Sequence, residues 1–154
     1  MDQVETSLWH PGTGRQAAVV RVRDLASAAP VTVVAGKYVL VIACGKQTGP
    51  LDEKAARAWI DAGASYICAW GPDSEKVEEA FDYASFLPEL GEPLPFTLMT
   101  TSHSDETLQE ALWFTFYNAT HPDDLEQELT SVVMIVDSDS LETACIAWVK
   151  ENTE

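Results

Sequence analysis

Short apolar runs alternate with amphipathic segments along the chain from Lys37 onward. Four of the runs are rich in β-branched residues and predict strands over residues 38–43, 65–70, 95–100 and 132–137. The first and the last are apolar at nearly every position, which is typical of strands that are buried on both faces. The alternation therefore predicts a series of βα units, with a mostly parallel sheet between helices.

The segments between these runs have the 3.6-residue period of amphipathic helices. The first helix is expected to end at Gly63 and to bury one face, made of Ala55, Ala58, Trp59 and Ala62. The second covers residues 73–87 with its charged residues outward, and the last begins with a capping-box pattern from Asp139 to Glu142. The third, residues 105–118, is apolar on more than one face, so it is central to the core or packs against a partner.

The first 36 residues have a weaker pattern. Residues 9–14 are rich in turn formers and predict a loop, whereas residues 17–23 change from continuous to alternating apolar positions and predict a strand at a sheet edge. We therefore expect a single three-layer α/β domain over residues 1–154, flavodoxin-like or Rossmann-like, with about five strands and helices on both faces. Residues 1–36 supply the loop and the edge strand, and residues 37–154 supply four βα units.

Acidic residues are concentrated in the later part of the chain. The formal net charge is −16, of which residues 1–50 contribute +2 (five basic, three acidic) and residues 51–154 contribute −18 (four basic, 22 acidic). Such a surface repels nucleic acid and anionic lipid, so we expect neither as a partner. A partner protein with a basic surface is favoured, although acidic helix faces also have the simpler explanation that they keep a protein soluble.

Cysteine usage and the N-terminal residues predict a cytoplasmic protein. Cys44, Cys68 and Cys145 are odd in number, widely spaced and embedded in apolar sequence, which indicates reduced thiols in a core. The first residues lack the basic and apolar regions of a secretion signal. No apolar run approaches the roughly 20 residues that cross a bilayer, so no membrane association is expected.

Polar residues follow the predicted strands, and ligands of parallel sheets bind at this edge. Cys44, His103 and either Asp137 or Asp139 would all lie there, and they are the residue types of a thiol nucleophile, its base and an orienting carboxylate. They predict a small thiol-dependent hydrolase or transferase. The alternative, which we favour, is a buried cysteine, a loop histidine and an aspartate that caps a helix.

The loop of residues 45–49 has features of a phosphate-binding turn. Its glycines expose backbone amides, and Lys46 and Thr48 add a charge and a hydroxyl, with Ser102 and Asp139 at the same edge. These residues are the candidates for a nucleotide or small-ligand sensor. Neither GxxxxGK[ST] nor GxGxxG is present, so an ordinary strand-to-helix turn is the favoured interpretation and no cofactor is expected.

Two further classes of site are disfavoured. His103, Asp105, Asp137 and Asp139 have ligand types that suit magnesium or manganese, but acidic residues before helices are already explained by the helix dipole, so no metal is expected. A receiver domain of two-component signalling needs an acidic pair after its first strand. Here Cys44 and Gly45 follow that strand, which excludes the assignment.

Residues 99–114, MTTSHSDETLQEALWF, together with the later run VVMIVD, resemble a motif of a bacterial domain family of unknown function. The resemblance implies a small bacterial α/β protein. It implies no activity and no catalytic residue.

The leading hypothesis is a non-catalytic interaction domain, of the accessory or immunity type, whose acidic face binds a basic partner. It is motivated by the charge of residues 51–154, the apolar third helix and the lack of a specific catalytic motif, so an enzyme is disfavoured. The thiol-dependent enzyme and the ligand sensor remain alternatives. Exposed Trp113 or Phe116 would also be compatible with a homodimer.

Overall fold

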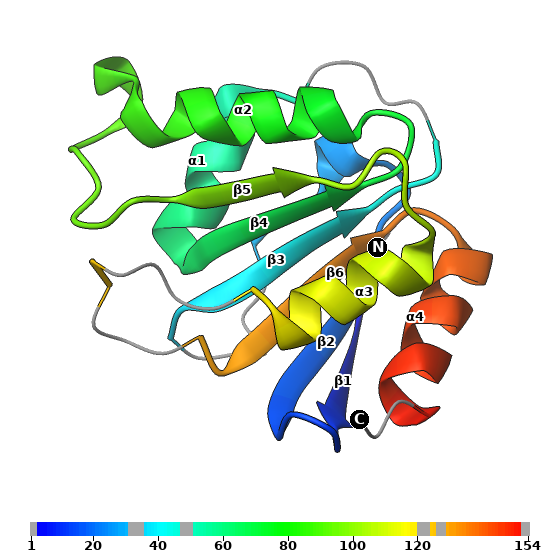
Figure 1. Cartoon of the computed structure of the whole chain (residues 1–154). Coiled ribbons are helices and arrows are strands. Elements are labelled where there is room, and N and C mark those ends of the chain that lie inside the picture. Colours follow the sequence, from blue (N-terminus) through cyan, green and yellow to red (C-terminus); the bar gives the residue numbers. More distant parts are fainter. Residues whose placement is uncertain (1–2, 31–35, 47–50, 120–123, 126–128, 152–154) are drawn as a thin grey trace.

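The chain forms one six-stranded sheet in the order β1-β2-β6-β3-β4-β5 (Figure 1). The computed structural model describes residues 3–30, 36–46, 51–119, 124–125 and 129–151. The strands are Val4–His10 (β1), Arg15–Arg21 (β2), Tyr38–Ala43 (β3), Ala64–Trp70 (β4), Met99–Ser102 (β5) and Ser131–Val136 (β6). Every neighbouring pair is parallel except β1 with β2, which confirms the mostly parallel α/β fold.

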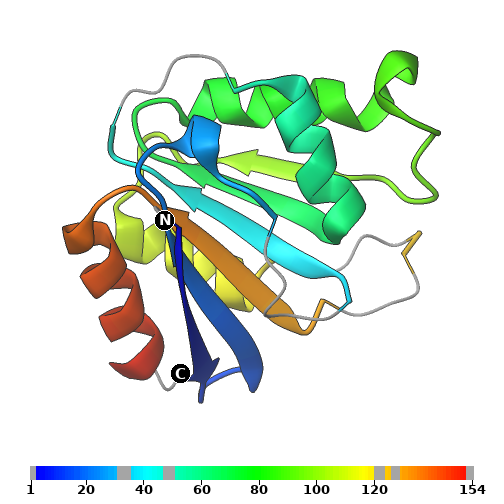
Figure 2. The same ribbon diagram turned by 180° about the vertical axis from the view of Figure 1, so that it is seen from behind.

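Helices cover both faces of this sheet (Figures 1 and 2). They are α1 (Glu53–Ala62), α2 (Ser74–Phe86), α3 (Leu108–Tyr117) and α4 (Asp139–Glu151), with short 3-10 helices at Leu25–Ser27 (η1) and Pro88–Leu90 (η2). Leu40 and Ile42 of β3 pack toward α1 and α2, whereas Val39 and Val41 pack toward α3 and α4. Because side chains alternate along a strand, an apolar run such as β3 needs a helix layer on each side.

The N-terminal prediction is wrong in two respects. Trp9 and His10 belong to β1 rather than to a loop, and β2 lies between β1 and β6 rather than at the edge. The polar residues at the end of β2 led to the expectation of an edge strand. Arg21 is polar for another reason, because it pairs with Asp139 and Glu142 of α4. The sheet therefore has a sixth strand, and this strand forms one of its two edges.

Two other predicted elements are displaced. The strand expected at residues 95–100 is β5, Met99–Ser102, because Phe96 is a buried loop residue whose apolar character mimicked a strand. The buried face of α1 is Ala56, Arg57, Trp59 and Ile60, so Ala58 and Ala62 are exposed instead. Within the described residues, no helix combines the length and the apolar character that crossing a membrane requires.

Candidate functional site

The carboxyl ends of the parallel strands bring Cys44, His103 and Asp137 to one edge of the sheet, as expected. Cys44 follows β3 and His103 follows β5, so one strand lies between them and the spacing is roughly 10 Å. They also lie on opposite faces. Cys44 belongs to the core under α1 and α2, whereas the His103 ring packs against Phe114 of α3 at 4.9 Å. The structure does not bring this thiol and this imidazole together.

The surroundings of Cys44 favour a neutral thiol. Its side chain is 5% exposed, and Sγ lies 4.0 Å from the carbonyl oxygen of Ile135. Gly71, at φ +115°, passes so close that an added Cβ would stand 2.1 Å from the Cys44 carbonyl oxygen. Burial raises the pKa of the thiol well above its usual value, and the charge of Asp137 raises it further. A nucleophilic cysteine needs the opposite environment.

Asp137 and the following loop satisfy each other. The Asp137 carboxylate is 2% exposed and accepts hydrogen bonds from the backbone N–H groups of Gly45 (2.9 Å) and Lys46 (3.0 Å). The Lys46 ammonium donates to the carbonyl of Arg23 at 3.2 Å. The first two backbone amides of the candidate phosphate-binding loop therefore already donate to Asp137, the residue that follows β6. Thr48 lies outside the described residues.

The other predicted residues also have local structural roles. Asp139 pairs with Arg21, and α4 is capped one residue earlier than expected, because Ser138 Oγ accepts from Leu141 N at 3.3 Å. Ser102 Oγ donates to Ser74 Oγ at 3.1 Å, joining β5 to α2. Across the part of the chain that the structure describes, no group of three or more His, Cys, Asp or Glu side chains converges as a metal site would require.

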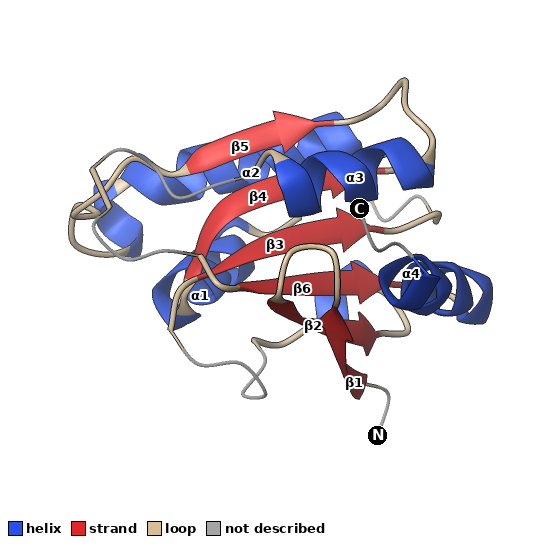
Figure 3. Cartoon of the chain, turned by 60° about the horizontal axis from the view of Figure 1, so that its bottom comes forward, coloured by secondary structure: helices blue, strands red, loops and turns tan. Residues whose placement is uncertain are grey.

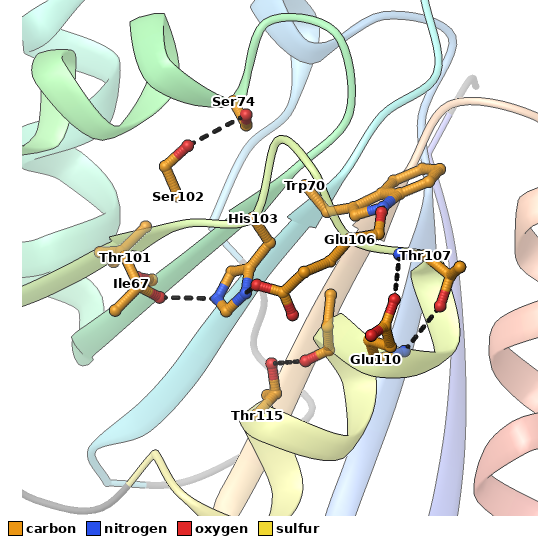
Figure 4. Close-up of polar contacts among 11 residues, drawn as sticks. Ile67, Trp70, Ser74, Thr101, Ser102, His103, Glu106, Thr107, Glu110 and Thr115 are labelled. Atoms are coloured by element: carbon orange, nitrogen blue, oxygen red, sulfur yellow. Dashed lines mark hydrogen bonds and ion pairs between the residues drawn. The ribbon is translucent and has the colours of Figure 1, made fainter.

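His103 is the centre of a polar cluster that the sequence analysis did not assemble (Figure 4). Its Nδ1 lies 2.7 Å from Glu106 Oε2, and its Nε2 lies 2.8 Å from Thr101 Oγ1, while the residue is only 4% exposed. Two patterns could have identified these partners. Residues two apart along a strand share a face, which places Thr101 beside His103. The turn after β5, in which the Glu106 N–H donates to the His103 carbonyl, brings Glu106 close to the imidazole.

This hydroxyl–imidazole–carboxylate chain has the order found in serine hydrolases, but its surroundings are structural. Thr101 Oγ1 also lies 3.5 Å from the Ile67 carbonyl, and Trp70 Nε1 donates to the Glu106 carbonyl at 2.9 Å (Figure 4). Next to it, Thr107 begins α3 in a capping box. The cluster therefore fastens β4 and β5 to the start of α3.

The helix α2 carries an acidic surface. Its buried hydrophobic residues are Val77, Ala80, Phe81 and Ala84, whereas Leu87, also expected to be buried, lies beyond the helix and is half-buried. As predicted, the charged residues face outward, and Glu75, Glu78, Glu79 and Asp82 surround one hollow. Residues 71–98 contain seven acidic residues and one lysine, a net charge of −6. Partial burial raises the pKa of Glu78, and the charge of Asp82 raises it further. Glu78 and Asp82 are four residues apart on the helix, so their carboxylates repel each other.

A cavity of about 810 Å³ adjoins the end of α2. Its apolar lining is Phe86, Leu90, Leu94, Phe96 and Leu98. Arg57 reaches its wall from α1 and is 6% exposed, with its donors directed to Asp61 Oδ1 (2.9 Å), the Ala84 carbonyl (3.3 Å) and the Glu92 carbonyl (2.7 Å). Phe86 is 61% exposed and Tyr83 is 44% exposed, so two aromatic rings continue the acidic face toward this cavity.

Comparison with known proteins identifies a family but no activity. No curated protein matches the chain. A family model described as a domain of unknown function, DUF7684, matches residues 16–152, which include all the described helices and all the described strands except β1 and the first residue of β2. The expected membership of an unknown-function family is thus confirmed, and the chain belongs to the DUF7684 family.

Proposed function

We propose that this chain is a non-catalytic interaction domain, of the accessory or immunity type, that binds a basic surface of a partner protein through α2. The observation that carries the proposal is the composition of one helix face. Four carboxylates, those of Glu75, Glu78, Glu79 and Asp82, are followed along the same helix by the exposed rings of Tyr83 and Phe86. We call these six residues the α2 face.

Repulsion within the α2 face favours a cationic partner. Glu75 with Glu79, and Glu78 with Asp82, are like-charge pairs four residues apart, and each such pair destabilises a helix by about 0.2–0.5 kcal/mol. The raised pKa of Glu78 has the same origin in part. Lysine or arginine side chains of a partner would relieve this repulsion on binding, and the acidic field would accelerate the encounter.

The cavity supplies the apolar part of the proposed interface. Charged rims contribute mainly to association rate and specificity, whereas buried aromatic or aliphatic anchors supply most of the affinity. A volume of about 810 Å³ is sufficient to accept one or two such side chains. The partner surface is therefore expected to combine several basic residues with an aromatic or aliphatic anchor.

The alternatives have less support from the geometry. The thiol-dependent enzyme requires a reactive Cys44 next to His103, and these residues lie on opposite faces of the sheet. The ligand sensor requires the amides that follow β3, and those of Gly45 and Lys46 bond to Asp137.

The test uses a cationic amphipathic peptide with one Trp anchor as the probe, and the same peptide with Ala in place of Trp. Glu75→Gln with Glu79→Gln should weaken binding at least about tenfold, and affinity should fall as salt rises. The matched control is Asp105→Asn with Glu151→Gln, which removes the same charge from exposed positions elsewhere. Isothermal calorimetry that finds equal losses for both variants, or an affinity indifferent to salt, would contradict the proposal.

A further inference from the structure

The strand β1 forms an edge with little of the usual protection against pairing. Edge strands are commonly shielded by charged side chains, especially lysine, by proline, by a bulge or by very short length. β1 has seven residues, VETSLWH, of which one, Glu5, is charged; it has no lysine or proline, and its register with β2 is continuous. Figure 3 shows β1 at one end of the sheet and β5 at the other, and no described strand pairs with the outer side of β1.

The hydrogen bonds of β2 establish which way its backbone groups point. The N–H of Gln16 donates to the carbonyl of Thr130, and the N–H of Val22 donates to the carbonyl of Val136, both on the side of β6. Backbone groups alternate sides along a strand. The even-numbered residues of β2 therefore point to β6, and the odd-numbered residues point to β1.

The register between β1 and β2 then identifies the outward groups of β1. Odd residues of β2 lie opposite even residues of β1, as in Val19 opposite Thr6. The remaining residues of β1, which are Glu5, Ser7 and Trp9, consequently direct their N–H and C=O groups away from β2. These three residues are the pairing groups that β1 offers to another chain.

We propose that β1 pairs antiparallel with β1 of a second copy of this chain, about a two-fold axis at Ser7. In this register Ser7 faces Ser7 of the partner subunit, and Glu5 faces Trp9 of the partner subunit. All three outward residues of each copy then exchange hydrogen bonds, and the two sheets become continuous. A shift by two residues in either direction leaves one of the three beyond the end of the facing strand.

Charge distribution favours a second copy at this edge. Two chains of net charge −16 repel each other, so they approach most easily where each is least acidic. Residues 3–30 carry three arginines and two acidic residues, a net charge of +1, and Glu5 is the only acidic residue of β1. Trp9 is 57% exposed and Val4 is 41% exposed, so pairing also covers apolar surface.

Cysteine cross-linking tests the register. Directly opposed, hydrogen-bonded residues of antiparallel strands have Cα atoms about 5.5 Å apart, which suits a disulfide. The native cysteines are buried and do not compete. In a buffer of oxidised and reduced glutathione, Ser7→Cys should form a covalent dimer on a non-reducing gel. Thr6→Cys, which would face Leu8 of the partner subunit, is the matched control and should cross-link far less. Equal cross-linking of the two variants, or none, would overturn the proposal.

Sedimentation of the unmodified chain provides a second test. The wild type should dimerise, Ser7→Lys should weaken the dimer at least about tenfold, and Trp113→Lys should have little effect. Raising salt from ~0.05 M to ~0.5 M should strengthen the dimer because it screens two acidic chains, whereas it should weaken binding at the α2 face. The two proposals can therefore fail separately. A monomer at ~100 μM, or a dimer broken by Trp113→Lys alone, would contradict pairing through β1.

Discussion

The two edges of the sheet have the same kind of backbone but different surroundings. β1 is seven residues long and carries one acidic side chain, whereas β5 has four residues and lies against α2. At β5, Thr100 Oγ1 donates to Asp82 Oδ1 at 2.6 Å, which places a carboxylate of the α2 face at the edge itself. A second acidic chain would be repelled at β5 and a basic one attracted. The two edges thus have similar backbone groups but different charge, and for this reason the two proposals assign them different partners.

The largest effect that separates these two ends is expected from Arg57, which supports the acidic end. Arg57→Ala leaves the carbonyls of Ala84 and Glu92 without their donor and opens the wall of the cavity. The free energy of unfolding should fall by about 2–4 kcal/mol, as measured by urea denaturation. Asp61→Asn is the matched control, because the Asp61 side chain is 57% exposed, and its loss should cost less than about 1 kcal/mol. Dimerisation through β1 should survive in both variants. Equal losses of unfolding free energy in the two variants would show that Arg57 stabilises the protein through its ion pair with Asp61 and not through the two carbonyls.

The opposite end depends on aromatic packing. The His10 ring of β1 stacks on Trp148 of α4, with centroids 5.3 Å apart and planes 7° apart, and it also contacts Phe116 at 4.5 Å. Trp148→Ala should destabilise the protein by about 2–3 kcal/mol and should loosen β1, so that the dimer weakens while peptide binding at the α2 face does not. Trp113→Ala is the control, since that ring is 50% exposed. Thermal unfolding and sedimentation measure the two effects. If the dimer is unchanged in Trp148→Ala, the packing of β1 on α4 is not needed for self-association, and this prediction is wrong.

The sequence predicted the central strands better than the edge strand β1. β3 and β6 are buried at every position, so their continuous apolar runs identified them. β1 escaped because an edge strand that leaves Val4 and Trp9 exposed has no continuous apolar run. The outward position of the charged residues of α2 was predicted because charged and apolar residues alternate along this helix with the helical period, whereas the exposure of Tyr83 and Phe86 was not predicted.

The candidate site shows a second physical reason for a miss. Sequence order placed Cys44, His103 and Asp137 correctly at one edge, since all of them follow parallel strands. It did not indicate the face on which each side chain lies, because that depends on where the pleat of each strand ends. The partners of His103 within its own segment, Thr101 and Glu106, were therefore predictable from local spacing. Whether the side chains that follow β3 and β5 contact each other was not predictable.

An intermediate effect is expected at His103, which joins the acidic end to the start of α3. His103→Ala removes contacts to Thr101 and Glu106 and should lower the free energy of unfolding by about 1–3 kcal/mol. Ser104→Ala, at an exposed neighbouring position, is the control. Hydrogen exchange should show faster exchange in β5 and little change in β1. A uniform increase across the sheet would indicate global unfolding instead of a local anchor.

The smallest effect tests repulsion within the α2 face directly. The pKa of Glu78 is raised by partial burial first and by the charge of Asp82 second, so its carboxylate is less favourable in the folded chain than in the unfolded one. A raised pKa of an acid lowers stability above its unfolded pKa, about 4.5, and has no effect once both states are protonated. Glu78→Gln should therefore raise the melting temperature near pH 7, by an amount equivalent to about 0.2–0.5 kcal/mol, and the gain should vanish below about pH 4. The same substitution should weaken binding of the cationic peptide. It removes the repulsion between Glu78 and Asp82 before binding, so a basic partner gains less by neutralising these carboxylates. A gain in stability that persists at low pH would place its cause in packing rather than charge.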